Sequence, residues 1–217
     1  MNGRIFRVML AAQARYVAPF LALGIFAAVA VPMLTVQGID NVPHNFNDRA
    51  GQVLDQSTMA APLFPILAVC LGCFIAVATW LPDIAGRWVY VLSLPVDRVR
   101  LAAHRLATGV VLILPVALAL WLSSLFAISL AGLGAPIVVA PGSLALRFLL
   151  ASILTFFVVS PVVLFSRRTW IVLVCLVLVA IIFSVRLPGL PSLIDLLFLH
   201  EMSPLHPLAG QWRLFDV

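Results

Sequence analysis

Two cysteines spaced three positions apart are the residues best suited to chemistry in this sequence. Cys70 and Cys73 stand in the apolar string AVCLGCFIA, and the Cys-x-x-Cys spacing serves redox pairs and half-sites for metals. Phe74 follows where covalent haem attachment requires histidine, and Cys175 lies in a different apolar run. Because a thiol in an apolar helix stays protonated and packs as a small hydrophobe, we interpret the pair as structural. A membrane thiol oxidoreductase is an alternative that rests on these two residues alone.

The histidines do not form a convincing ligand set. They are His44, His104, His200 and His206. The last two flank Glu201 in HEMSPLH, but Pro204 between them prevents the i, i+4 arrangement that a helix would offer to a metal. We therefore predict neither a metal site nor a cofactor in this chain.

The basic residues are all arginine. The sequence has 13 of them and no lysine. A P-loop nucleotide site needs the lysine of its Gly-Lys-Ser/Thr ending to reach the terminal phosphates, and Schiff-base chemistry needs a lysine amine. Both activities are therefore excluded for this chain.

The composition is that of a membrane protein. Apolar residues make up 64% of the chain, charged residues only 10%, and the mean hydropathy is +1.17. An average soluble domain has about 25% charged residues. In lipid, backbone polar groups must be satisfied internally, and the apolar runs here are continuous rather than alternating, so helices are expected rather than a barrel.

Five apolar stretches are long enough to cross a bilayer, which takes about 20 residues. They are residues 16–36, 59–81, 106–131, 144–165 and 169–185. We therefore predict an all-α, polytopic helical membrane protein with a single domain over residues 1–217 and five transmembrane helices. A sixth would have to lie in 187–217, where Asp195 and Glu201 stand among prolines. Because a central acid is costly in a spanning helix, we predict an outer re-entrant or interfacial tail there.

The arginines set the expected orientation. With a cytoplasmic N-terminus, nine arginines fall on the inner side and four on the outer side, as the positive-inside rule favours. Residues 37–58 then form a polar outer loop. Residues 1–15, in which Arg4, Arg7 and Arg15 alternate with apolar side chains, fit either a helix in the inner interface or the basic flank of the first span.

Polar residues inside the spans are mostly hydroxyls. They are Thr79, Ser123, Ser124, Ser129, Thr155 and Ser160. Such side chains most often bond to carbonyls of their own helix or pack helix against helix. Pro65, Pro115 and Pro161 are expected to kink their helices. No ionisable residue stands at the centre of a predicted span, which disfavours ion-coupled transport.

The segment 83–105 between the second and third predicted spans is basic and aromatic. We predict that Asp83 or a neighbour caps a short helix that starts near Ile84 and stops before Pro95. A new helix is predicted to begin near residues 96–97 and to run into the third span. A short helix with exposed aromatics would dock another protein, and the alternative is a basic loop that only sets topology.

At this segment the sequence resembles the permease subunits of type-2 ATP-binding-cassette (ABC) transporters. The family pattern has an acid and a glycine, a short coupling helix, a Leu-Pro-Val-Ser-Arg-like string and a basic stretch. The matching residues are Asp83, Gly86, Leu94, Pro95, Val96, Asp97, Arg98, Arg100 and Arg105. The family usually has six spans with both termini inside, whereas this sequence predicts five.

The resemblance implies a membrane-spanning permease subunit that exports an amphipathic or lipid-like substrate. ATP and magnesium would be bound by a separate cytoplasmic ATPase subunit, and a second permease subunit would complete a homodimer or heterodimer in the inner (cytoplasmic) membrane. No nucleic-acid partner is expected. The expected ATPase-coupling residues are Asp83, Gly86, Arg87, Trp88, Tyr90, Leu94, Pro95, Asp97 and Arg98. The alternatives are a haem-exporter-like permease of cytochrome maturation and a non-transporting scaffold or sensor subunit.

Overall fold

The computed structural model describes residues 3–36, 46–85, 98–131, 138–139, 141–165, 212 and 214–216. Within these ranges the chain is helical apart from one pair of two-residue strands, short turns over 35–36 and 61–62, and the single residues 212 and 214. The elements are α1 (Gly3–Leu34), α2 (Phe46–Ala60), α3 (Leu63–Ala85), α5 (Arg98–Ala131), β1 (Val138–Val139), α6 (Pro141–Phe165) and β2 (Phe215–Asp216).

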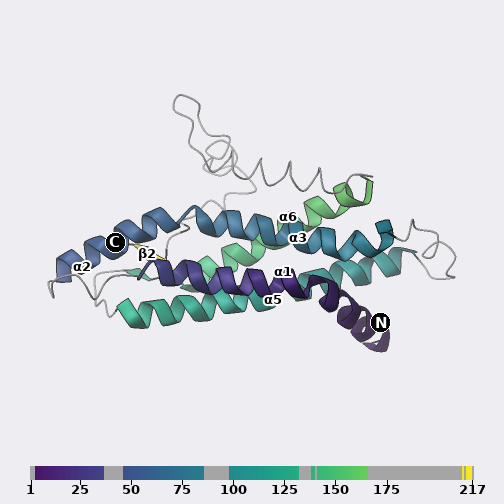
Figure 1. Ribbon diagram of the computed structural model, residues 1–217, viewed down its shortest axis with the longest axis horizontal. Coiled ribbons are helices and arrows are strands. Elements are labelled where there is room, and N and C mark those ends of the chain that lie inside the picture. Colours follow the sequence, from purple (N-terminus) through teal and green to yellow (C-terminus); the bar gives the residue numbers. More distant parts are fainter. Residues whose placement is uncertain are drawn as a thin grey trace, which may run out of the picture.

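Four long helices form an elongated bundle (Figure 1). α1 and α5 run in one direction and pack on each other, α3 and α6 run in the other and pack on each other, and contacts of α1 with α3 and of α5 with α6 close the ring. We call the end where α1 and α5 begin the arginine end. The end where α6 begins and the strands lie is called the strand end.

In the described part of the chain, four helices are long and apolar enough to cross a membrane, over Leu10–Leu34, Gly51–Trp80, Val99–Leu130 and Pro141–Leu164. These match four of the five spans expected from the sequence. The fifth expected span, 169–185, lies outside the described residues, as does most of the expected tail 187–217. A total of five or six spans therefore stays a prediction.

Helix α1 includes the residues expected to form a separate interfacial helix. It runs without a break from Gly3 to Leu34, although its first turns bend away from the bundle in Figure 1. Pro19 lies in the first turns of the span, and its ring removes the helical hydrogen bond to the Arg15 carbonyl and crowds that carbonyl, which favours a bend at this point. The arrangement corresponds to a basic flank continuous with the first span. Its placement in a membrane interface stays a prediction.

The polar connection expected over 37–58 contains a helix. α2 covers Phe46–Ala60, and its Val53, Ser57 and Ala60 are buried at helical spacing. This spacing is hidden in the sequence by polar neighbours, so the helix within 46–58 was not expected. That the connection lies outside the membrane stays a prediction. α2 meets α3 at a turn over Ala61 and Pro62, which places Pro65 in the first turn of α3. A proline in a first turn removes no helical hydrogen bond, so the kink expected at Pro65 has no cause.

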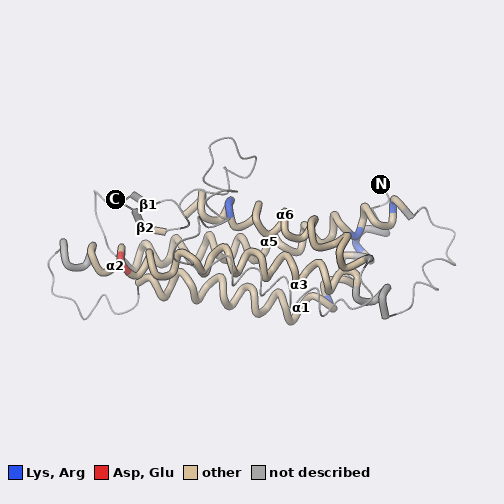
Figure 2. Tube along the Cα trace, turned by 90° about the horizontal axis from the view of Figure 1, so that it is seen from above, with Lys and Arg blue, Asp and Glu red and all other residues tan. Residues whose placement is uncertain are grey.

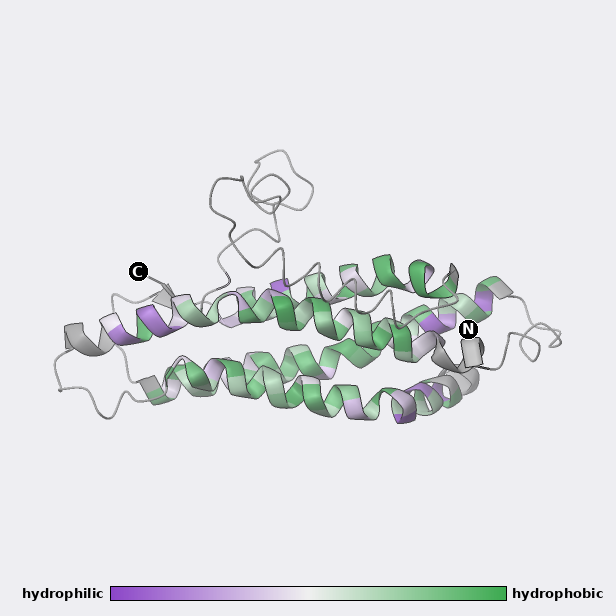
Figure 3. Cartoon of the chain, turned by 45° about the horizontal axis from the view of Figure 1, so that its top comes forward, coloured by the Kyte–Doolittle hydropathy of each residue, from purple (hydrophilic) through white to green (hydrophobic). Residues whose placement is uncertain are grey.

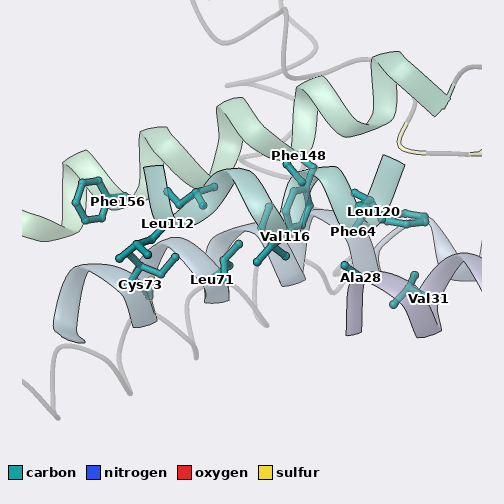
Figure 4. Packing of buried hydrophobic residues seen from close by; sticks show 14 of the residues in the cluster. Ala28, Val31, Phe64, Leu71, Cys73, Leu112, Val116, Leu120, Phe148 and Phe156 are labelled. Carbon is teal, nitrogen blue, oxygen red and sulfur yellow. The ribbon is translucent and has the colours of Figure 1, made fainter. Parts of the chain in front are cut away.

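The interior is packed closely around small residues on facing helices. A Cβ added to Gly72 of α3 would lie 2.6 Å from the Ser152 carbonyl oxygen of α6. One added to Gly109 of α5 would lie 2.3 Å from Cζ of Phe156, also on α6. Figure 4 shows Phe156 beside other buried apolar side chains of α3 and α5. Small residues that let helices approach are the usual basis of packing in membranes.

The outward-facing surface of the bundle is apolar as well. Exposed side chains in the spans include Phe26 on α1, Leu118 and Phe126 on α5, and Leu154 and Val158 on α6. Figure 3 shows hydrophobic colours along the middle of the helices, with hydrophilic residues near the ends. Helices that are apolar on all sides require a lipid environment, so this surface is suited to contact with acyl chains.

The strand pair closes the strand end. β1 and β2 are antiparallel, with Val138 opposite Asp216 and Val139 opposite Phe215. Leu214, just before β2, is 1% exposed and belongs to the hydrophobic core. Residues 214–216 therefore lie at the end of the bundle opposite the start of α1 (Figure 1).

Candidate functional site

The structure describes the helices on both sides of the expected coupling segment. Asp83 lies in the last turn of α3 and Arg98 is the first residue of α5, both at the arginine end. The side chains of these two residues, and the whole of residues 86–97, lie outside the described part. The expected coupling residues in that interval are Gly86, Arg87, Trp88, Tyr90, Leu94, Pro95 and Asp97.

One detail of the expected segment is corrected and another is confirmed. α3 continues through Pro82, Asp83 and Ile84 to Ala85, so Asp83 does not cap a new helix at Ile84. A cap residue has non-helical backbone, whereas Leu81, Ile84 and Ala85 extend the helix of the span. The second helix begins at Arg98, as predicted from the proline and aspartate before it.

An arginine of α5 and a tryptophan of α3 connect the two helices that flank residues 86–97. The Arg105 guanidinium carbon lies over the Trp80 ring, 5.5 Å from its centroid. Trp80 is 4% exposed and Arg105 is half-buried. A guanidinium within about 6 Å of an indole face is attracted by the ring quadrupole, and more strongly where water is excluded. This cation–π contact therefore holds the end of α3 against the start of α5.

A second polar contact connects α5 to α1 one turn further into the bundle. The Thr108 hydroxyl donates to the Gln13 side-chain oxygen and also lies 2.8 Å from the carbonyl oxygen of Arg105. Thr108 is completely buried and Gln13 is 8% exposed. Because Thr108 follows Arg105 by three positions, both contacts extend from one face of α5. We call Gln13, Trp80, Arg105 and Thr108 the polar junction.

Three buried polar groups in or beside the polar junction have no hydrogen-bond partner among the described residues. They are Nε2 of Gln13, Oγ1 of Thr79 and Nε1 of Trp80. A buried polar group without a partner costs about 1–3 kcal/mol. The cost falls on the arginine ends of α1 and α3, next to the segment that resembles a coupling helix.

The hydroxyls elsewhere in the spans behave as predicted. Ser124, Ser129, Thr155 and Ser160 each donate to a carbonyl three or four residues earlier in their own helix. Ser123 donates to Leu120 and also lies 2.8 Å from the Ala28 carbonyl of α1, so it packs helix against helix as well. Thr79 is the exception, which adds to the distinct character of the arginine end.

The described charged side chains are distributed unevenly along the bundle. Arg7, Arg15, Arg100 and Arg105 lie toward the arginine end, and Asp55 lies on α2 at the other end (Figure 2). Arg147 lies near the beginning of α6. Which of the two ends faces the cytoplasm stays a prediction from the positive-inside rule.

The cysteines pack as apolar residues. Cys73 is completely buried in the hydrophobic core, Cys70 is half-buried, and both are free thiols (Figure 4 shows Cys73). Leu71, Ile75 and Ala76 around them in the sequence belong to the same core cluster. These surroundings support the structural interpretation of the pair. Cys175 lies outside the described residues.

The histidine that the structure describes, His104, contacts a backbone carbonyl of its own helix. His104 Nδ1 lies 2.6 Å from the Arg100 carbonyl oxygen, one turn earlier in α5. His44, His200 and His206 lie outside the described residues, together with Glu201. In the described ranges, no three His, Cys, Asp or Glu side chains gather as a metal site would require.

Sequence reasoning missed most of the polar junction. Arg105 was expected only as part of a basic stretch, and Gln13 and Thr108, which are 95 positions apart, were not singled out. A usable signal exists, because each polar residue stands on the buried face of an otherwise apolar helix.

No protein-family model matches the sequence, and no curated protein or solved structure is significantly similar to it.

Proposed function

We propose that this chain is the membrane-spanning permease subunit of an ABC transporter. One observation carries the proposal: α3 ends and α5 begins together at the arginine end, connected by the Arg105–Trp80 contact, with the coupling-like sequence between them. A partner that binds residues 86–97 would act directly on two packed spanning helices. The sequence match at Gly86, Leu94–Asp97 and Arg98 provides independent support.

Because the sequence has no lysine, we infer that ATP is bound by a second chain and that this chain spans the membrane. ATP and magnesium would be bound by a cytoplasmic ATPase subunit, and this chain would convert the movement of that subunit into helix movement. Arg87, Trp88 and Tyr90 would form the contact, as the resemblance implies. ATPases of this class act in pairs, so a second permease subunit, identical or homologous, would complete the transporter.

The proposed topology has a cytoplasmic arginine end and five spans. α6 runs from Pro141 beside β1 to Phe165, and 25 helical residues cover about 37 Å. Phe215 pairs with Val139 at the opposite end, so Phe165 and Phe215 lie on opposite sides of the proposed membrane. One further crossing between them, at the expected span 169–185, would place the C-terminus outside. The membrane would be the inner (cytoplasmic) membrane.

The proposed cargo is amphipathic or lipid-like, and the proposed direction is export. The described spans present apolar side chains outward, such as Phe26, Phe126 and Phe157, so a lipid-like molecule would meet a compatible surface. The serines of the described spans bond to helix carbonyls, which leaves little polar surface for a hydrophilic solute.

Purification of the chain from its own membrane tests the proposal. A tagged copy in mild detergent is expected to retain a second protein that hydrolyses ATP only with magnesium. Replacement of the P-loop lysine in that second protein is expected to abolish hydrolysis without releasing it. Recovery of a cytosolic protein that does not hydrolyse ATP would contradict the transporter and favour the scaffold alternative.

A further inference from the structure

The polar junction differs from the rest of the bundle interior in how its polar groups are satisfied. Buried hydroxyls elsewhere, such as those of Ser124, Ser152 and Ser160, bond to carbonyls of their own helix. At the arginine end, the Gln13 amide nitrogen, the Thr79 hydroxyl and the Trp80 indole nitrogen lack partners among the described residues. Burying three polar groups without hydrogen-bond partners costs free energy. The packed state of the arginine end is therefore less stable than its apolar contacts alone would make it.

These groups lie at about one level of the bundle. Gln13 is joined to Thr108, Trp80 is joined to Arg105, and Thr108 stands three positions after Arg105 on α5, a rise of about 4.5 Å. Trp80 lies five positions before the end of α3 at Ala85. The junction therefore forms one layer that connects α1, α3 and α5 just inside the arginine end.

The strand end is closed in a different way. Leu214 is buried in the core, and β2 pairs with β1. Phe64 in the first turn of α3 and Leu144 in the first turn of α6 are completely buried as well. Among the described residues of α1, α3, α5 and α6, the buried side-chain atoms without a hydrogen-bond partner are those at the arginine end, and the Gln52 side-chain oxygen of α2 is one at the strand end. Gln52 apart, the strand end is closed by apolar packing, whereas the arginine end is closed by a thin layer of polar contacts.

We propose that the polar junction is a latch that holds the arginine ends of α3, α5 and α1 together and opens during the working cycle. When the ends separate, water reaches Gln13, Thr79 and Trp80 and supplies their missing partners. Arg105 then exchanges the indole face for water or a lipid headgroup. The loss of apolar contact is offset by hydration, so the closed and open states differ little in free energy.

The latch deepens the proposed function and rests on it for its role. Residues 86–97 connect the last turn of α3 to the first turn of α5, so a force applied there separates or joins Trp80 and Arg105. Arg105 and Trp80 are therefore positioning residues that determine whether movement at the segment reaches both helices. The bond between Thr108 and Gln13 connects α1 to α5, so movement of α5 at this end also reaches α1.

A labelling experiment in lipid vesicles tests the latch without any partner protein. The reporter is a cysteine at position 76, made by Ala76→Cys after Cys70, Cys73 and Cys175 are changed to alanine. Ala76 is completely buried, one turn deeper than Trp80 on the same face of α3. A membrane-impermeant maleimide added from the arginine side reacts with the reporter only when water passes the junction.

The expected result depends on the guanidinium charge. Arg105→Gln is expected to raise the labelling rate about threefold or more, because it removes the cation–π contact, whereas Arg105→Lys keeps a cation and stays near the parent rate. Arg100→Gln is the matched control, since Arg100 is exposed on the same helix. Thr108→Val removes the bond to Gln13 at nearly equal volume and is expected to raise the labelling rate as Arg105→Gln does. If Arg105→Gln does not fold, the labelling rate of Thr108→Val tests the latch in its place.

Equal labelling in Arg105→Gln, Thr108→Val and the parent would overturn the latch, as would an equal increase in Arg100→Gln. In the complex with the ATPase, ATP is expected to change the labelling rate of the parent, and Arg105→Gln is expected to lose that response while it still binds the ATPase. If no ATPase accompanies the chain, the proposed function fails, but the vesicle experiment still decides whether the latch exists.

Discussion

Phe156 of α6 lies against Gly109 of α5, and a Cβ on Gly109 would be only 2.3 Å from the Phe156 ring. Phe156 is completely buried, so its ring has little room to move aside. The two residues fix how closely α5 and α6 approach. This close approach near the arginine end is part of the frame from which the polar junction extends.

Gly109→Ala is therefore expected to destabilise the bundle. The added methyl group forces a shift in a packed interior, which costs about 1–3 kcal/mol. Gly51→Ala is the control, because an added Cβ meets nothing within 4 Å there and alanine favours the helix by about 0.5–1 kcal/mol. Denaturant or thermal unfolding in detergent measures both. Equal stability of Gly109→Ala and the parent would show that the α5–α6 contact is looser than described.

Adjacent serines on α5 separate interhelical bonding from bonding within a helix. Ser123 lies 2.8 Å from the Ala28 carbonyl of α1, whereas within the described part of the chain Ser124 bonds to Leu120 of its own helix alone. Ser123→Ala is expected to lower the free energy of unfolding by about 0.6 kcal/mol, a typical value for such bonds in membranes. Ser124→Ala is expected to leave it nearly unchanged. The reverse order in unfolding experiments would contradict the assigned contacts.

The Cys-x-x-Cys pair is expected to be dispensable for function. Replacement of Cys70 and Cys73 with serine should leave binding and stimulation of the ATPase unchanged. It should lower stability, because Cys73 is completely buried and serine brings a hydroxyl into an apolar core. ATP hydrolysis by the purified complex and its unfolding temperature measure the two effects separately. Loss of function with unchanged stability would favour the redox alternative.

The C-terminus is expected to lie on the opposite side of the membrane from the N-terminus. A cysteine introduced by Val217→Cys, in a chain without other cysteines, should react with an impermeant maleimide only from outside intact cells. A cysteine introduced by Asn2→Cys is the control and should react only after the membrane is opened. Labelling of both from the same side would contradict the five-span topology.

Much of the bundle could be predicted from the sequence because hydrophobic length is a strong signal. Four spans were located in this way, and the third was expected to end at Ala131, where α5 ends. α2 was missed because its apolar positions are sparse and surrounded by polar residues. The predicted cap at Asp83 failed because α3 continues through Asp83 to Ala85, so Asp83 lies in the last turn of one helix and not at the start of another.

The polar junction could not be predicted because its partners are brought together only by packing. Gln13 and Thr108 are 95 positions apart, and the Arg105–Trp80 pair requires α3 and α5 to lie side by side. Sequence indicates that each residue is polar and lies in an apolar helix, but not which neighbour it faces. The bonding of Ser124 and Ser160 was predictable because it is local to one helix.

The central claim is that a separate ATPase binds residues 86–97. The most direct test combines Arg87→Glu with Trp88→Ala and measures the ATP-hydrolysing protein that co-purifies with the tagged chain. Arg49→Glu with Phe46→Ala is the matched control, since it makes the same charge reversal and also removes an aromatic ring, on α2 at the strand end. The account predicts release of the ATPase from the first double variant and full retention by the second. Retention of the ATPase, with its normal stimulation, by both variants would contradict the account.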